Sequence, residues 1–230
     1  MQIADAFAGK HICLVLACNR EFYEKRRQEN QATFDILKKT AFVIVYLYAD
    51  NSISDIKFAQ VSRDEYKMYI PAPEIYELLP YKVNVAYDFF SRQNIAGILK
   101  IDDNTVISFP DIIEHDFIDL TTKYDYIGLE QVKISKDKTP YIRMVNRTKE
   151  SLLENIYHKV DIDVTYFAGP FYYLSPRAVA QVAAVGLRFG YEDMAVGYAV
   201  AKNPQIKSYL WNFKNRGVSW DNKKELEPNY

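Results

Sequence analysis

Short apolar runs bounded by polar residues recur along the first half of the chain. They cover residues 11–18, 41–48 and 95–101, and each is rich in isoleucine, valine and leucine. Runs of this length are typical of buried strands in a largely parallel sheet. Residues 124–130 and 165–174 have a similar character, so we expect further strands there.

Helical patterns lie between the predicted strands. Apolar residues step by three or four positions along segment 76–90, which places them on one helix face: Tyr76, Leu79, Val83, Tyr87 and Phe90. Segment 21–39 is charged and lacks proline and glycine, so it predicts a helix as well. Ser175 before Pro176 predicts a helix start, with the serine as N-cap. Glu192 and Asp193 predict another start, because the helix dipole stabilises acids in a first turn.

The alternation of strands and helices predicts an α/β fold, with a mostly parallel central sheet flanked by helices. A length of 230 residues suits one domain. We expect a single Rossmann-like domain over residues 1–230, with a core from about 11 to 216. Residues 131–149 are polar and predict a surface loop or lid, and residues 217–230 predict a polar, frayed tail.

Composition narrows the class of protein. The chain is 49% hydrophobic and 26% charged, with a net charge of −1, so it resembles a soluble globular protein and nucleic acid is a disfavoured partner. Cys13 and Cys18 are five positions apart, which points them to opposite faces of a strand and prevents their pairing. The apolar run 12–18 is too short to span a membrane, which takes about 20 residues. We therefore expect a soluble or cytoplasmic protein.

An acidic motif follows the third apolar run: Lys100-Ile101-Asp102-Asp103-Asn104. Ligands of open α/β sheets bind beyond the carboxyl ends of strands. Hard oxygen ligands suit Mg²⁺ or Mn²⁺, and these ions bind phosphates through one or two carboxylates. The motif is thus a candidate site for a nucleotide diphosphate, although Asp-Asp-Asn is equally a common turn after a strand.

Two later segments carry further candidate chemistry. Gly169 allows a close backbone approach, and the neighbouring rings of Phe171 and Tyr172 suit an acceptor pocket that stacks on sugar faces. Asp193, at a helix start, can accept a proton from a hydroxyl nucleophile, and the helix dipole would keep it ionised. Taken singly, each segment also fits a plain structural role, as core aromatics or as a helix cap.

Together, the order and spacing of these segments resemble the beta-1,3-galactosyltransferase and Fringe-like family of inverting glycosyltransferases. The resemblance runs from about residue 11 to residue 204. Lys100–Asn104 is similar to the family's Lys-x-Asp-Asp-Asp, and Glu192-Asp193-Met194 with Gly197 is similar to Glu-Asp-Val-x-x-Gly. Gly169, Tyr172 and Ser175 match Gly-x-x-Tyr-x-x-Ser. Arg26-Arg27 and Thr33-Phe34 stand where the family has an Arg-rich stretch ending in Thr-Trp.

The resemblance implies a GT-A fold, a UDP-sugar donor, a glycan acceptor and a divalent metal, usually Mn²⁺. It makes Asp193 the catalytic base, with Glu192 beside it in the motif. It gives Asp102 a place near the uridine ribose and makes Asp103 and Asn104 the metal ligands. Asn104 departs from the usual Asp, which weakens the metal affinity it implies. The family often has a metal-binding histidine after the Glu-Asp motif, whereas the histidines of this chain, among them His158, all precede Glu192. Asn212 or Asp221 are loose substitutes for that ligand. Family members usually carry a Golgi membrane anchor, so the resemblance implies a microbial or viral protein here, and a Golgi one only if an anchor was removed.

Several assignments remain open at this stage. The cations of Arg26, Lys82 and Lys100 are candidates for pairing with the diphosphate, and each equally fits an ion pair within the protein. Trp211 and Trp220 suit either sugar stacking or core packing. The favoured activity is transfer of galactose or N-acetylglucosamine from UDP to a sugar hydroxyl. The alternatives are another nucleotide sugar such as a deoxyhexose, a non-catalytic carbohydrate- or nucleotide-binding domain, and an unrelated α/β domain.

Overall fold

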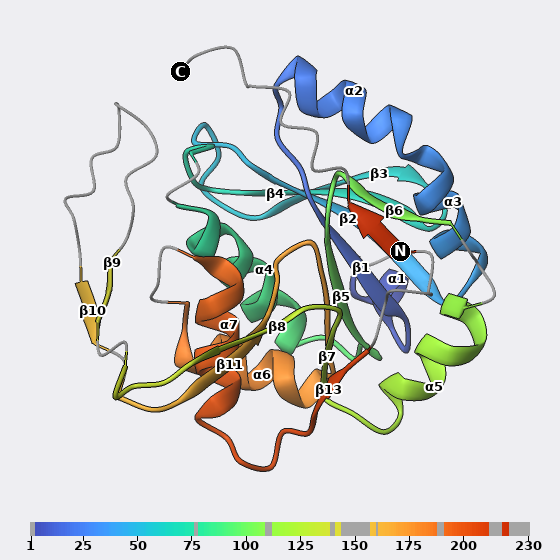
Figure 1. Cartoon of the computed structure of the whole chain (residues 1–230). Helices are drawn as coiled ribbons and strands as arrows, with labels where there is room; N and C mark the ends of the chain where they lie inside the picture. The colour runs from blue at the N-terminus through green and yellow to red at the C-terminus, as the bar shows by residue number, and fades with distance from the viewer. Residues whose placement is uncertain are drawn as a thin grey trace.

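The computed structural model describes residues 3–75, 78–108, 112–138, 141–143, 157–159, 161–187, 191–211 and 218–220. Figure 1 shows a central sheet with helices on both sides. The helices are α1 (Ile3–Phe7), α2 (Glu21–Glu29), α3 (Gln31–Lys39), α4 (Leu79–Ser91), the π-helical turn Ile112–Phe117, α5 (Ile118–Thr121), α6 (Pro176–Val185) and α7 (Glu192–Ala201). This is the expected α/β architecture of a Rossmann-like domain.

The main sheet has eight strands in the order β13-β7-β12-β5-β1-β2-β4-β3. They are β1 (His11–Leu16), β2 (Phe42–Ala49), β3 (Lys57–Ser62), β4 (Glu65–Ile70), β5 (Gly97–Asp102), β7 (Tyr126–Gly128), β12 (Phe171–Leu174) and β13 (Ser208–Leu210). The strands β4, β2, β1 and β5 are parallel to one another, whereas β12 runs antiparallel between β5 and β7. The sheet is therefore mostly parallel, as the apolar runs predict.

Three small antiparallel pairs complete the described structure. They join β8 (Gln131–Ile134) to β11 (Val164–Phe167), β9 (Tyr141–Arg143) to β10 (Tyr157–Lys159), and β6 (Thr105–Ile107) to β14 (Val218–Trp220). The polar segment 131–149 is thus not a plain loop, because its first residues pair with β11. The predicted tail also contributes a strand, β14, and residues 221–230 lie outside the described part of the chain.

Alternating side chains of the buried strands build two cores, one on each face of the sheet. In β1, Ile12 and Leu14 face the core covered by α1, α4, α6 and α7, while Cys13 and Val15 face the core covered by α3 and the segment 113–118. Figure 1 shows these two groups of helices on opposite sides of the sheet. Cys18 lies two residues beyond the end of β1, and the thiols of Cys13 and Cys18 are both free, as expected.

Two predicted elements are split in the structure. The helix expected over 21–39 breaks at Asn30, whose side-chain amide donates a hydrogen bond to the main-chain oxygen of Asp103 at 2.6 Å. The strand expected over 165–174 is divided into β11 and β12 by Ala168, Gly169 and Pro170, which form a loop. Both breaks arise from contacts with the acidic turn after β5, because the Pro170 oxygen accepts hydrogen bonds from the Asp102 amide and the Thr105 hydroxyl.

The predicted start of α6 is confirmed. Ser175 has an extended backbone, and its hydroxyl oxygen accepts a hydrogen bond from the Ala178 amide, as an N-cap does. The same hydroxyl donates to Asp125 at 2.8 Å, so the cap is tied to the loop before β7. The predicted helix start at Glu192 is confirmed as well, since α7 begins there. In the described ranges, no helix has the length and apolar character to cross a membrane.

Gly197 is needed where α7 packs on β11. A Cβ atom built there would lie 2.3 Å from the Tyr166 Cβ and 2.8 Å from the main-chain oxygen of Thr165. Such distances leave no room for a methyl group, so the glycine of the Glu-Asp-Met-x-x-Gly segment has a packing role. It allows α7, and the acids in its first turn, to approach β11 closely.

We predict that Gly197→Ala destabilises the protein. Alanine favours a helix interior by about 1 kcal/mol over glycine, but overpacking against backbone atoms typically costs about 1–3 kcal/mol or more. The free energy of unfolding in urea should therefore fall. Gly169→Ala is the matched control, since the nearest atoms to its new Cβ lie at 3.6 Å, an ordinary contact. Equal stability of Gly197→Ala and wild type would contradict the packing role.

Candidate functional site

The candidate site lies at the carboxyl ends of β1 and β5, where the order of the parallel strands reverses. From β1 the chain builds β2 and β4 on one side and then returns to place β5 on the other. Such a switch point leaves a crevice that binds ligands in open α/β sheets. Asp102 is the last residue of β5 and lies opposite Leu16 of β1. Its side chain is 31% exposed, so its carboxylate reaches solvent at this edge.

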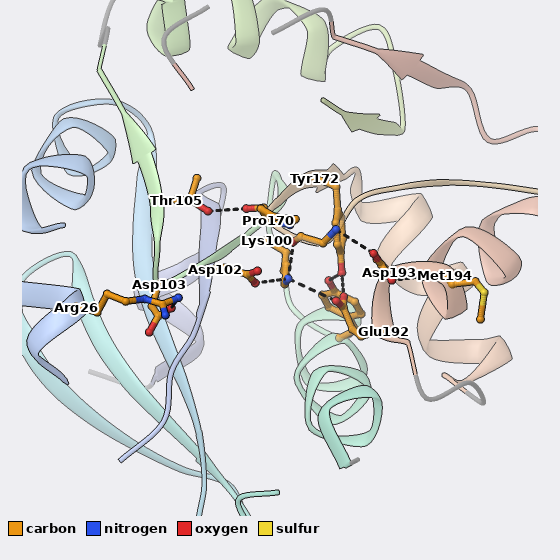
Figure 2. A network of polar contacts seen from close by, with 12 residues as sticks. Arg26, Lys100, Asp102, Asp103, Thr105, Pro170, Tyr172, Glu192, Asp193 and Met194 are labelled. Atoms are coloured by element: carbon orange, nitrogen blue, oxygen red, sulfur yellow. Dashed lines mark hydrogen bonds and ion pairs between the residues drawn. The ribbon is translucent and has the colours of Figure 1, made fainter. Parts of the chain in front are cut away.

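Lys100 is at the centre of the polar network, and its side chain is only 2% exposed. Its ammonium donates hydrogen bonds to Asp102 Oδ1 at 2.6 Å and to the Gly169 oxygen at 2.5 Å. It also lies 3.5 Å from Glu192 Oε2 (Figure 2). Burial lowers the pKa of Lys100, but the Asp102 and Glu192 carboxylates outweigh it, so the pKa is raised and the ammonium stays charged. Lys100 thus joins the end of β5, the loop before β12 and the start of α7.

Glu192 points inward, toward the core between the sheet and α4. Its Oε1 accepts a short hydrogen bond from the Tyr172 hydroxyl, and that hydroxyl lies 2.7 Å from the Tyr87 hydroxyl on α4. Burial raises the pKa of Glu192 to about 7, and the Lys100 charge offsets only part of this. The Glu192 side chain is only 4% exposed, so in this structure it cannot touch a substrate directly. The prediction of a catalytic role is therefore corrected to a structural or positioning role.

Asp193 is the more exposed of the two acids at the start of α7, and its side chain, beside the Gly169 loop, is only partly buried. Its Oδ2 accepts a hydrogen bond from the Gly169 amide at 3.0 Å, and its Oδ1 accepts one from the Met194 amide at 2.8 Å. Its pKa is raised, because burial outweighs these amides and the Lys100 charge. The position at a helix start therefore does not lower the pKa of this acid below its ordinary value. The raised pKa makes Asp193 a better base than an ordinary aspartate.

Asp103 turns away from Lys100 and pairs with α2. Its Oδ1 accepts a hydrogen bond from the Arg26 guanidinium at 2.7 Å, and its side chain is 6% exposed. Burial raises the pKa of Asp103 to about 6, although Arg26 acts to lower it. Its other oxygen, Oδ2, is buried without a hydrogen-bond partner. The guanidinium also lies over the rings of Phe22 and Tyr23, at 5.6 and 5.5 Å from their centres, so α2 covers this end of the acidic turn.

Lys82, the third cation considered, occupies the other side of the switch point. Its ammonium donates hydrogen bonds to Glu74 Oε1 at 2.7 Å and to the Ala17 oxygen, just beyond β1, at 2.6 Å. Lys82 and Lys100 are both buried. Direct pairing of either ammonium with a diphosphate therefore does not agree with their positions, and the alternative of ion pairs within the protein is the one observed. Arg26 is more exposed than either lysine, and it too is paired, with Asp103.

The aromatic residues expected to line an acceptor pocket lie in the cores. Phe171 and Tyr172 are almost completely buried, on opposite faces of the sheet, and neither ring offers a face to solvent. Trp211 is buried against Phe117 and Phe171, in agreement with the packing alternative. The acceptor-wall prediction is therefore corrected for Phe171 and Tyr172. Gly169 alone of that group lies at the crevice, beside Asp193.

Fewer donors gather for a metal ion than the resemblance implies. The described segments contain no group of three or more His, Cys, Asp or Glu side chains that could hold one. Asp103 and Asn104 lie in the turn after β5, with the unpartnered Asp103 Oδ2 as the suitable oxygen. Asn212 and Asp221, the loose substitutes for a late ligand, lie outside the described residues, as do the side chains of His158 and Trp220.

Some members of the network could not be identified from the sequence. Tyr87 belongs to the apolar stripe of α4, and nothing in its spacing separates it from an ordinary core aromatic. Glu74 lies in a segment without a strong pattern, yet it binds Lys82 and the Ala49 amide. The only available signal is that a buried lysine in a strand or helix requires an acidic partner.

Comparisons with known proteins add little to this geometry. No protein-family model matches the chain, and no curated protein matches it in sequence. Among solved structures, the chain is similar to HddC from Yersinia pseudotuberculosis, at 10% sequence identity and a TM-score of 0.43. That alignment covers 87% of this chain and 90% of HddC. A likeness of this degree carries no argument about function, so the functional interpretation rests on the residues themselves.

We predict that Glu192 makes stability decrease as the pH rises. Because its pKa is about 7 in the folded protein and ordinary when unfolded, the folded state holds a proton between about pH 4.5 and 7 that the unfolded state releases. The unfolding free energy of Glu192→Gln minus that of wild type should therefore increase over this range, by up to about 1.4 kcal/mol per pH unit.

Urea unfolding at pH 5, 6, 7 and 7.5 tests this. Asp103 and Asp193 also have raised pKa values, but they are present in both proteins, so the difference isolates Glu192. Parallel stability curves for the two proteins would show that Glu192 ionises normally.

Proposed function

We propose that the protein is a nucleotide-sugar-dependent glycosyltransferase of the inverting, Fringe-like type, with UDP-hexose as its donor and a glycan hydroxyl as its acceptor. The observation that supports this most is the convergence of three distant segments. The acidic turn after β5, the Gly169 loop and the first turn of α7 meet around Lys100 at the sheet's switch point. These are the three segments that carry the family resemblance, in a place where α/β sheets bind ligands.

Asp193 is the proposed catalytic base. Its carboxylate is partly exposed, and it is held by the amides of Gly169 and Met194. It would take the proton from the acceptor hydroxyl, whose oxygen then forms a bond to the anomeric carbon. The bond between that carbon and the diphosphate oxygen breaks, and the electron pair leaves with UDP. Attack from the face opposite UDP inverts the configuration at the anomeric carbon. In the family that the chain resembles, the product is a beta linkage to the 3-hydroxyl of the acceptor.

The acidic turn is the proposed donor site. Asp102 is exposed enough to contact the ribose part of a nucleotide, and Arg26 reaches the same turn from α2, where it pairs with Asp103. The buried, unpartnered Asp103 Oδ2 fits a hard cation, so Asp103 and Asn104 would hold Mn²⁺ or Mg²⁺, with phosphate oxygens as further ligands. Bound there, the ion would supply positive charge that offsets the charge developing on the diphosphate.

We expect Asp193→Asn to lower turnover strongly and to leave UDP binding intact. A positioned base typically contributes about 10²–10⁴-fold in rate, and asparagine keeps the shape while it loses basicity. Sugar transfer and UDP calorimetry measured on the same sample separate the two effects. Asp119→Asn is the matched control, because Asp119 lies on α5, is exposed, and forms an ion pair with the exposed side chain of Lys123. Turnover within a factor of about three of wild type in Asp193→Asn would remove it as the base.

The donor and the metal are tested by UDP release from a panel of UDP-sugars, with Mn²⁺ and with EDTA. We expect release from one UDP-hexose, with loss of activity in EDTA and recovery on adding Mn²⁺. Release from a different nucleotide sugar, such as an activated deoxyhexose, would keep the transferase class and change the donor. UDP binding without turnover, for every donor and acceptor tried, would instead favour a non-catalytic binding domain.

A further inference from the structure

A lysine in the middle of a buried strand requires an explanation. Lys100 is on β5, between β1 and β12, and faces the same core as Ile98, while Leu99 and Ile101 face the other. The corresponding positions of β1 and β2 hold Leu14 and Val45, and apolar residues of this kind would pack there without any charge to bury. Replacing a buried ion pair by apolar residues is often neutral or stabilising. Stability alone therefore gives no reason for a lysine at this position.

The ammonium has three N–H donors, and three acceptors from separate elements surround it. They are Asp102 at the end of β5, the Gly169 oxygen in the loop before β12, and Glu192 in the first turn of α7. Figure 2 shows the Lys100 nitrogen between the carboxylates of Asp102 and Glu192. A single charge thus fixes the relative positions of three elements that have no other common residue in this network.

The link from Lys100 to Asp193 passes through Gly169. The oxygen of Gly169 accepts from Lys100, and its amide donates to Asp193 Oδ2. A Cβ atom built on Gly169 would lie 3.6 Å from both Lys100 Nζ and Asp193 Oδ2, so the two side chains flank this one residue. The orientation of the Gly169 backbone therefore determines where the Asp193 carboxylate is held.

The other end of the network holds Glu192 in place. The Tyr172 hydroxyl donates to Glu192, and Tyr172 is paired with Lys100 across β12 and β5, with its ring centre 5.6 Å from the ammonium. Burial keeps the pKa values of Tyr172 and Tyr87 well above their ordinary range, so both hydroxyls remain neutral and able to donate.

We propose that Lys100 is a positioning residue: its ammonium, oriented by Glu192, fixes the Gly169 loop and thereby the place and charge of the Asp193 carboxylate. The proposal rests on the proposed function only for what Asp193 then does to an acceptor. The groups around Asp193 are Lys100 and Asp102 from β5, Tyr126 from β7, Tyr166 from β11 and Glu192 from its own helix. Among them only Lys100 is cationic, so it is the side chain that favours the ionised form of Asp193, together with the amides of Met194 and Gly169.

The Gly169 amide provides a test that does not depend on activity. The chain has 8 glycines, so ¹⁵N-glycine labelling gives a simple spectrum in which Gly169→Ala identifies the Gly169 signal. Because this amide donates to Asp193, its chemical shift should follow the ionisation of that acid with pH. Asp193→Asn should abolish this titration.

Two variants that move the titration midpoint of the Gly169 amide in opposite directions distinguish positioning by charge from a merely structural role. Lys100→Met should raise the titration midpoint of the Gly169 amide by about one pH unit or more, because the favourable cation is lost. Asp102→Asn should lower the midpoint, because the Asp102 carboxylate that repels Asp193 is lost. Lys100→Arg, which keeps the charge, should stay close to wild type. Lys82→Met, which removes a buried paired ammonium on the other side of the switch point, should leave the midpoint unchanged.

Midpoints that are unchanged, or that shift in the same direction in Lys100→Met and Asp102→Asn, would overturn the proposal. If Lys100→Met does not fold, an unchanged midpoint in Asp102→Asn has the same consequence. Where the protein transfers sugar, the acidic limb of its pH–rate profile should move with the amide midpoint. Absence of transfer with the expected midpoint shifts would refute the proposed function and leave the positioning role of Lys100 standing.

Discussion

The fold around the crevice depends on one buried charge, the ammonium of Lys100. A cation this deep in a sheet must be matched by acids and carbonyl oxygens, or the cost of removing it from water is not recovered. The matching groups come from three places in the chain, so the end of β5, the Gly169 loop and the start of α7 are held together by one requirement. Glu192 then needs its own donor, which Tyr172 supplies. Each buried polar group in this network therefore requires a further polar partner, from Lys100 to Glu192 and from Glu192 to Tyr172.

Two further cations near the ends of β1 and β5 are also matched by acids. Lys82 is bound by Glu74 and by the chain just beyond β1, and Arg26 is bound by Asp103. Acid and base are therefore balanced locally as well as in the nearly neutral whole chain. The acids that retain solvent contact, Asp102 and Asp193, are both next to Lys100 or the loop it fixes. At this edge of the sheet, Asp102 and Asp193 keep contact with solvent, while Lys82 and Lys100 are buried.

The strands and helix starts could be predicted because they depend on local patterns. The apolar runs gave β1, β2 and β5, and Ser175 before Pro176 gave the start of α6. The break at Asn30 could not be predicted, since it depends on a hydrogen bond to Asp103, more than seventy residues away. The order of the motif residues identified where the polar groups gather, but not which way each one points. Glu192 and Asp193 are adjacent in sequence, and only the position of the buried lysine decides that the first turns inward.

The antiparallel direction of β12 has a consequence for how well the two halves of the site can be aligned. Because β12 runs opposite to β5, the loop that precedes it lies at the edge where β5 ends, and Tyr172 is paired with Lys100. A slip of two residues between the strands would keep every side chain on its own face but would carry Gly169 about 7 Å away from the lysine. The register of the β5–β12 pair thus sets the distance between the acidic turn and the Gly169 loop that holds Asp193, and this register can change only by whole residues. The alignment of the site is therefore set by this pairing and not by the length of the chain that joins β8 to β11.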